Sequence, residues 1–353
     1  MSVNQYALNI LFHSNHDVLF YEGPSFDKGR EDQVNIRSGS ITFHFQSAKK
    51  MDIHDLLYSA RSRLRSQIQR ALTFYLAIHG TIPPVRSIEL HHNEHIEIVH
   101  HSHFTKTWSN CYTTKKFNAA DLTPIFSDHP AGRMIYDVLT YWLKSKLDEF
   151  VHDQFRFLWS GFNAFYNYMD QLSQASASVK SSRESEKLRN FEKEVMQAIE
   201  FKETLNYLRT LPDEFYVDVI HWYKFIKSKN CNHWVGILSR YPDGIISQQI
   251  VKYASVAYSD ETKLIHEMNQ MAKKHAQVID HFVRLKFLLI ELLYFVRNQH
   301  FHAANHYQLF VITAPDQRLA EDYYCDILQH VLVDSIKSMK RISKSKSILS
   351  TQS

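Results

Sequence analysis

Cysteine, glycine and proline are scarce in this chain. Its 353 residues include three cysteines, eight glycines and eight prolines. Cys111, Cys231 and Cys325 are odd in number, far apart and without C-x-x-C spacing, so they form neither a disulfide framework nor a zinc ligand set. A reducing compartment such as the cytoplasm is therefore expected. The low glycine and proline content indicates a compact, mainly helical protein rather than a loop-rich or disordered one.

The sequence also lacks a long uninterrupted apolar run and a strong net charge. Its strongest apolar run, residues 282–296, is interrupted by Lys286 and Glu291 and does not predict a membrane span. No charged-then-apolar leader opens the chain, so we expect neither secretion nor membrane insertion. The net charge of +4 permits nucleic-acid binding but does not by itself indicate it.

Residues 1–128 predict a small α/β (α+β) domain whose role is sensing or substrate selection. Short β-like runs at residues 6–12, 18–21 and 40–45 are separated by the turn signals Gly23-Pro24 and Ser38-Gly39. Residues 52–79 then carry an apolar stripe at helical spacing. Four arginines lie mostly off that stripe and predict a solvated face that could also contact phosphates: Arg61, Arg63, Arg65 and Arg70.

Six histidines follow in a predicted hairpin over residues 87–104, with Asn93-Glu94 near its turn. They are His91, His92, His95, His100, His101 and His103. Neutral imidazole is a common metal ligand. Strand alternation, however, places these side chains on both faces, and no cysteine joins them. We therefore favour a solvated or weakly metal-retaining patch over a dedicated metal site, and we predict no cofactor.

Residues 129–342 predict a helical domain that begins after the turn residues 127–132. Aromatic residues recur through residues 135–172, and a stripe of this kind is typical of a core rather than of a base-stacking platform. The basic, serine-rich residues 343–353 predict a disordered tail. The expected fold class is therefore mainly α, with a smaller N-terminal α/β module.

Polar residues cluster where the apolar run ends. Tyr294, Asn298, His302 and His306 succeed one another at intervals of four residues, with Arg297 beside them. On a continuous helix they would form one polar stripe. A cation, an amide and an imidazole would then converge at the end of a buried helix.

Arg297, Asn298 and His302 resemble the motif of the HEPN superfamily, whose ribonuclease members carry Arg, a polar residue and then His. The resemblance covers roughly residues 132–340, and residues 157–166 look like the first long helix of some members. It implies a HEPN-like helical bundle and a metal-independent endoribonuclease of antiviral defence or toxin systems. It also implies a homodimer with a composite active site, and a regulatory protein or antitoxin as partner.

The three residue types suit RNA cleavage, because RNA supplies its own nucleophile, the 2′-hydroxyl. An imidazole such as His302 can transfer the proton, and Arg297 can offset the charge that grows on the phosphorane. Asn298 can hold the hydroxyl or the imidazole in place. The products would be a 2′,3′-cyclic phosphate and a 5′-hydroxyl. Further candidates for substrate contacts are Tyr294, His300 and His306.

Two other interpretations of these residues stay open. The chain could be a noncatalytic HEPN-like module that binds RNA or nucleotides, or a helical protein-interaction module in which Arg297 forms an ion pair at a helix end. The spacing bears on this choice, because Arg297 and His302 would lie about 140° apart on a straight helix. Joint action would require the arginine to swing round or the helix to break.

Overall fold

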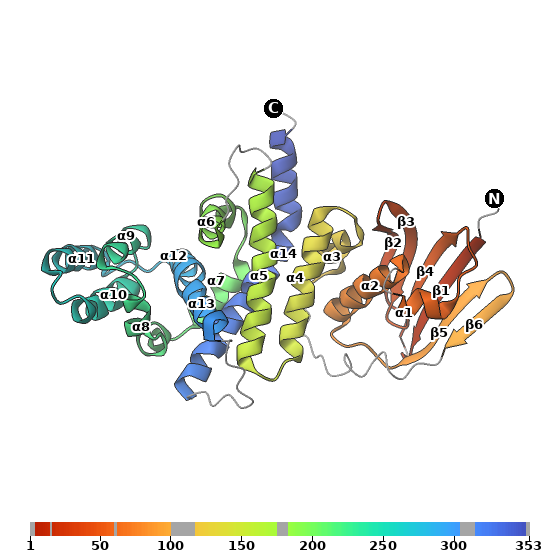
Figure 1. Cartoon of the computed structure of the whole chain (residues 1–353), viewed down its shortest axis with the longest axis horizontal. Coiled ribbons are helices and arrows are strands. Elements are labelled where there is room, and N and C mark those ends of the chain that lie inside the picture. Colours follow the sequence, from red (N-terminus) through yellow and green to blue (C-terminus); the bar gives the residue numbers. More distant parts are fainter. Residues whose placement is uncertain are drawn as a thin grey trace. The chain divides into compact units, whose positions relative to one another are not determined.

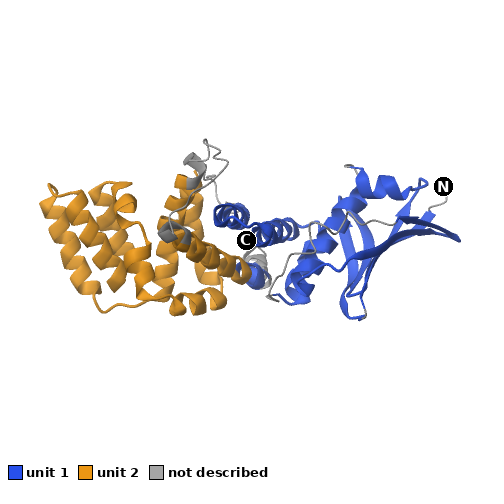
Figure 2. Cartoon of the chain, turned by 90° about the horizontal axis from the view of Figure 1, so that it is seen from below, with its two compact units in different colours: residues 1–175, 335–353 blue, residues 176–334 orange. Residues whose placement is uncertain are grey.

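The computed structural model describes residues 4–14, 16–59, 62–99, 117–174, 183–303 and 315–350 (Figure 1). Side chains are not described at residues 173–174, 300–303, 315–318, 340 and 343–350. The protein is mainly helical with a small antiparallel sheet near its N-terminus, which confirms the predicted class at that level. It divides into two compact units, residues 1–175 with 335–353 and residues 176–334 (Figure 2).

The first unit contains one antiparallel sheet in the order β2-β3-β4-β1-β5-β6. Its strands are β1 (Asn4–Phe12), β2 (Leu19–Asp27), β3 (Arg30–Arg37), β4 (Ser40–Ser47), β5 (Val85–His92) and β6 (His95–Val99). Alternate residues of the central strands, such as Leu8, Ile10, Ile41 and Phe43, are fully buried. This period of two makes one face apolar, and helix α2 packs against that side of the sheet.

The strand predictions were correct for β1, β4 and the start of β2, but the rest of the segment between β1 and β4 differs from the prediction. Gly23-Pro24 lies inside β2 rather than in a turn, and strand β3 was not predicted. β2 is an edge strand, where a proline costs no ladder hydrogen bond. The chain turns instead at Lys28 and Gly29, both of which have positive φ angles. The predicted hairpin at Asn93 is confirmed, because β5 pairs with β6 there.

The remaining elements of the first unit are helical, and α4 and α5 pack against each other. They are α1 (Ile53–Tyr58), α2 (Arg63–His79), α3 (Ala119–Leu122), the 3-10 turn η1 (Thr123–Phe126), α4 (Pro130–Leu147) and α5 (Val151–Gln174). The sequence placed a boundary at residues 128–129, whereas the two compact units separate α5 from α6. Helix α5 contains residues 157–166, the aromatic segment that resembles a HEPN helix.

The arginines of α2 do not form the solvated face expected from the sequence. Arg70 is only 6% exposed, donates to the Phe26 carbonyl at 2.9 Å and faces Asp27. Arg63 lies 2.9 Å from Asp32, a carboxyl group whose pKa is raised by burial although Arg63 opposes that shift. Both arginines therefore neutralise carboxylates of the β2–β3 hairpin, and Arg61 lies outside the described residues.

The second unit is built from short helices and ends within the long helix α14. Its elements are α6 (Glu184–Asn190), the π-helical η2 (Phe191–Val195), the 3-10 turn η3 (Met196–Ala198), α7 (Lys202–Thr210), the π-helical η4 (Phe215–Val219), α8 (Trp222–Lys227), α9 (Cys231–Arg240), α10 (Gly244–Ala257), α11 (Thr262–His275), α12 (His281–Phe287), the π-helical η5 (Leu288–Leu292), α13 (Leu293–Ala303) and α14 (Pro315–Ser350). Helix α14 covers most of the segment for which the sequence predicted a disordered tail. Among the described residues no helix is long and apolar enough to cross a membrane.

Elements α12, η5 and α13 follow one another without a break and form a single rod, residues 281–303. Leu285, Leu288, Leu289 and Leu292 are buried, as the helical spacing of the apolar run predicts. The rod differs from the prediction at η5, where the turn is π-helical rather than α-helical. Such turns carry one extra residue and are frequent at functional sites.

A buried ion pair fixes the start of this rod. Arg284 of α12 donates through Nε to Asp243 at 2.8 Å, and the side chains are 4% and 0% exposed. Asp243 is also the N-cap of α10 and accepts from the backbone of Ile245 and Ile246. The guanidinium lies 4.6 Å above the ring of Tyr216, from η4. Three segments of the second unit therefore meet at one charge pair.

Replacing Asp243 with Asn should lower the free energy of unfolding by about 3 kcal/mol, because the buried guanidinium loses its counter-charge. The matched control is Asp280→Asn. Asp280 caps α12 through the same pair of backbone contacts but is exposed, and Asn caps as well as Asp. We expect a loss of about 0.5 kcal/mol or less there. Urea unfolding curves of both variants measure the difference, and equal losses would contradict this role for the ion pair.

Candidate functional site

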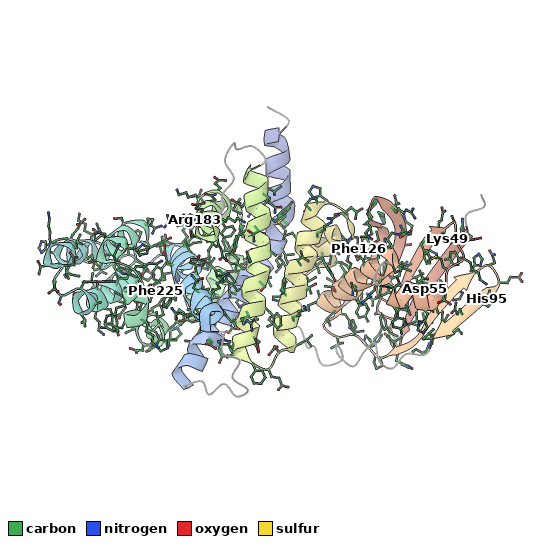
Figure 3. All side chains as sticks on the ribbon, viewed as in Figure 1. Lys49, Asp55, His95, Phe126, Arg183 and Phe225 are labelled. Carbon is green, nitrogen blue, oxygen red and sulfur yellow. The ribbon has the colours of Figure 1, made fainter. Side chains whose placement is uncertain are left out.

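The polar end of the rod borders a pocket of about 230 Å³ in the second unit. Helices α6, α9 and α13, the turn η5 and the end of α8 contribute to its wall. The residues that matter chemically are Arg189, Lys229, His233, Glu291, Tyr294 and Asn298. Phe225, which is labelled in Figure 3, forms part of its apolar wall. Two cations, an imidazole, a carboxylate, a phenol and an amide thus share one concave site.

Two of the residues singled out from the sequence lie in this wall. Tyr294 and Asn298 are one turn apart on α13, and both line the pocket. Helix α13 continues to Ala303, so His302 follows one turn later on the same helix. The side chains of His300 and His302 lie outside the described part of the structure, and so does the whole of His306.

Arg297 turns toward its neighbours Asn298 and Glu184. Its Nη1 atom donates to Oδ1 of Asn298 at 2.8 Å, and its Nη2 atom lies 3.1 Å from Oε2 of Glu184. The side chains of the ion pair are 22% and 25% exposed, so it is neither fully buried nor freely solvated. Glu184 starts helix α6, directly after Arg183, which Figure 3 labels. The helix does not break between Arg297 and His302; the arginine instead bends onto the amide.

A residue pair that sequence reasoning missed, His233 and Glu291, lines the same pocket. Nε2 of His233, on α9, lies 3.6 Å from one oxygen of Glu291, and Nη2 of Arg240 donates to the other at 3.2 Å. Glu291 belongs to the π-helical turn η5, and its side chain is 10% exposed. The carboxylate therefore joins an imidazole and a guanidinium that both come from helix α9.

The local sequence explains why His233 is held in place. Asn230 caps helix α9 and accepts from the His233 backbone nitrogen at 2.9 Å, which fixes the first turn. The next residue, Trp234, is fully buried and donates to the Ile226 carbonyl. The His233 ring lies edge-on to the Trp234 ring, at 5.1 Å between centroids. Its imidazole thus packs against Trp234 and lines the pocket.

A second carboxylate, Glu192 of η2, lies near the same charges. Burial raises the pKa of Glu192 above its ordinary value, against the lowering effects of the Tyr241 hydroxyl, Arg240 and Lys286. Burial also raises the pKa of the Tyr241 phenol, and the carboxylates of Glu192 and Glu291 raise it further. The neighbourhood of Glu291 therefore disfavours additional negative charge.

Where it is described, the histidine-rich hairpin shows no cluster of metal ligands. His91 lies 3.1 Å from Glu89 through Nε2, and the ring of His92 stacks on Tyr6 at 4.5 Å. His95 is exposed, whereas His100, His101 and His103 lie outside the described residues. Across the described ranges, no group of three or more His, Cys, Asp or Glu side chains is arranged to hold a metal ion.

No sequence signal pointed to His233, Glu291, Arg189 or Lys229. His233 and Asn298 are far apart along the chain, and neither lies in a local pattern that involves the other. Glu291 looked like an interruption of an apolar helix. The π-helical turn η5 and the contact of α9 with Glu291 create the pairing, and both arise from tertiary structure.

The raised pKa of Glu192 predicts a pH-dependent difference between wild type and Glu192→Gln. The folded protein holds this proton more tightly than the unfolded chain, so its contribution to the free energy of unfolding falls as pH rises above 4.5. The Gln variant should match wild type near pH 4 and become relatively more stable toward pH 7. Urea unfolding across this interval measures the difference. The control is Glu194→Gln, at an exposed position of the same turn, and an equal trend there would contradict the prediction.

Comparisons with known proteins do not extend these observations. No family model, no curated protein and no solved structure matches the chain. The resemblance to HEPN proteins therefore rests on Arg297, Asn298, His302 and the aromatic helix. The function has to be inferred from the geometry of the pocket itself.

Proposed function

We propose that this protein is a metal-independent endoribonuclease and that the pocket beside α13 is its active site. The observation that carries the proposal is the meeting of Tyr294 and Asn298 with His233, Arg189 and Lys229 in one wall. His302 follows on the same helix. Cleavage by the 2′-hydroxyl requires an imidazole, a cation and an oriented donor, and the pocket provides all three.

The charges of the pocket suit a phosphodiester. Arg189 and Lys229 place two cations in its wall, and Arg297 lies beside Asn298 within reach of the same helix end. Because Arg297 donates to the amide oxygen, Asn298 is oriented to present its Nδ2 hydrogens as donors. The half-buried aromatic rings of Tyr294 and Phe295 offer surfaces against which a base can stack.

The resemblance to HEPN ribonucleases supports the remaining parts of the proposal. It favours a helical bundle around the motif, a homodimer in which two copies of the motif approach one another, and control by a regulatory protein or antitoxin. It also favours a role in antiviral defence or a toxin-type system. Residues 1–128 would then select the substrate or sense a signal.

The central test is incubation of the full chain with total RNA in EDTA, followed by mapping of the ends. We expect 2′,3′-cyclic phosphate and 5′-hydroxyl ends, and a loss of rate by about 10²- to 10⁴-fold in His302→Ala. His266→Ala, which removes an exposed imidazole from α11, serves as the control and should keep the wild-type rate. An absence of cyclic ends, or an undiminished rate in His302→Ala, would contradict the proposal.

The Arg297–Glu184 ion pair generates a separate prediction. A phosphate must compete with the Glu184 carboxylate for this arginine, so Glu184→Gln should strengthen RNA binding by about three- to fivefold. Glu186→Gln removes the same charge two residues along α6, where the side chain is exposed and accepts from the Arg183 backbone. Binding of a noncleavable 2′-deoxy oligonucleotide, measured by fluorescence anisotropy, should change in the first variant and not in the second. Equal effects would show that only net charge matters.

The same ion pair favours a second candidate, a noncatalytic module that binds RNA or nucleotides or a protein partner. In that case Arg297 serves mainly to hold Glu184 and Asn298 at the end of α13. Binding of RNA would then survive His302→Ala and weaken in Arg297→Ala, with no cleavage by any variant. The mapping and binding experiments above separate the two functions.

A further inference from the structure

We propose that the sheet of the first unit carries a separate site, a slot that takes an unpaired nucleobase of single-stranded RNA. The slot belongs to a groove of about 810 Å³, within the range of roughly 300 to 1,000 Å³ that small-molecule sites occupy. The choice of RNA as ligand rests on the proposed endoribonuclease function. The slot would give residues 1–128 their role in selecting the substrate.

The strand register explains how the slot forms. On the face turned away from α2, Ala7 of β1 lies between His91 of β5 and His44 of β4, its direct neighbours across the two ladders. All three residues line the groove. Because neighbouring strands are about 4.8 Å apart, the backbones of the two histidines are about 10 Å apart, and only the methyl group of Ala7 lies between their side chains.

This spacing suits one planar ring between two imidazoles. Two successive ring contacts span roughly 9 to 14 Å between the outer rings, which matches the interval across Ala7. Histidine is one of the side chains on which the unpaired bases of RNA stack. A larger side chain at position 7 would occupy the same space.

One of the two imidazoles is held by its own strand. Nε2 of His91 lies 3.1 Å from Oε2 of Glu89, and the Ser87 hydroxyl donates to Oε1 of Glu89 at 2.8 Å. The three side chains share one face, because they alternate along β5. A ring that is already oriented loses less freedom when a base stacks on it. His44, on the other side of Ala7, is exposed.

Amide side chains beside the slot can contact the edge of a base. Gln5 and Gln46 are cross-strand neighbours on the same face, two residues from Ala7 and His44, and both are exposed. Asn93 reaches the same groove from the β5–β6 turn. An amide carries donors and an acceptor, as the edges of bases do. The groove therefore offers both stacking and hydrogen bonding.

The charges of the groove favour a neutral base over a bare phosphate chain. Arg30 and Arg63 line it together with Glu31 and Asp32, and Arg63 is paired with Asp32. Duplex binding depends on phosphate contacts and requires a surplus of cations. A peptide strand would add to a sheet edge, whereas this groove lies over β1 and β4, which are paired on both sides. Single-stranded RNA fits these observations best.

The test measures binding of the full chain, in EDTA, to a fluorescent 2′-deoxy oligonucleotide, as a single strand and as a duplex. We expect the single strand to bind more tightly. His44→Ala and His91→Ala should each weaken its binding about five- to tenfold, because each removes a stacking surface. Ala7→Ile should weaken it as much, since the branched side chain suits a strand but fills the slot. The slope of log Kd against log salt should stay unchanged in these variants, because stacking releases no counterions.

Matched controls lie outside the groove. His95→Ala removes an exposed imidazole from the same hairpin, and Ser40→Ile adds the same bulk to the same face, four residues from His44. Both should bind like wild type. Circular dichroism and urea unfolding check that every variant is folded.

Equal affinity for the single strand and the duplex would overturn this inference. So would a Kd within about twofold of wild type in the folded His44→Ala, His91→Ala and Ala7→Ile variants. Binding of adenosine or uridine 5′-monophosphate without binding of the oligonucleotide would overturn RNA as the ligand. A wild type that binds single strands through this groove but yields no cyclic ends would contradict the proposed endoribonuclease and support the slot, so the two failures are distinguishable.

Discussion

The buried contact between Asp243 and Arg284 determines where the polar end of the rod lies. Either group alone would be an uncompensated charge in the interior, so α10 and α12 can pack closely only where the two meet. The ring of Tyr216 beneath the guanidinium brings a third segment to the same point. Because α12 continues directly into η5 and α13, this contact also fixes the placement of Tyr294 and Asn298 against the pocket.

The pocket brings several charged side chains together in a small volume. One oxygen of Glu291 faces the imidazole of His233 and the other faces the guanidinium of Arg240. The carboxylate, which is 10% exposed, therefore has a basic group beside each oxygen. Nearby, burial raises the pKa of Glu192, and the Glu291 carboxylate adds to that shift. In the proposed function, Arg189 and Lys229 of the same pocket would offset the negative charge of the bound phosphodiester.

Local patterns predicted much of the fold and part of the site. Alternation identified β1 and β4, an asparagine turn identified the β5–β6 hairpin, and helical spacing placed Tyr294 and Asn298 on one face. Strand β3 was not predicted, because only Val34 and Ile36 of its alternating inward positions are apolar and the rest of the strand is charged or polar. The burial of Arg70 could not be predicted, because its carboxylate partner lies on a distant strand. The role of His233 could not be predicted for the same reason, because the sequence of neither segment shows that the two segments pair.

The π-helical turn η5 shifts the helical phase of the rod, so that residues before and after it follow different helical faces. One extra residue rotates everything that follows by about 100°, so the leucines buried up to Leu292 and the polar residues that line the pocket after it need not share a face. Core packing and site composition can therefore vary independently along one continuous helix. The length of this stretch cannot vary in the same way. The number of residues between Arg284 and Asn298 sets the direction in which the Asn298 amide points. Along this stretch, an inserted or deleted residue would disturb the pocket more than many substitutions would.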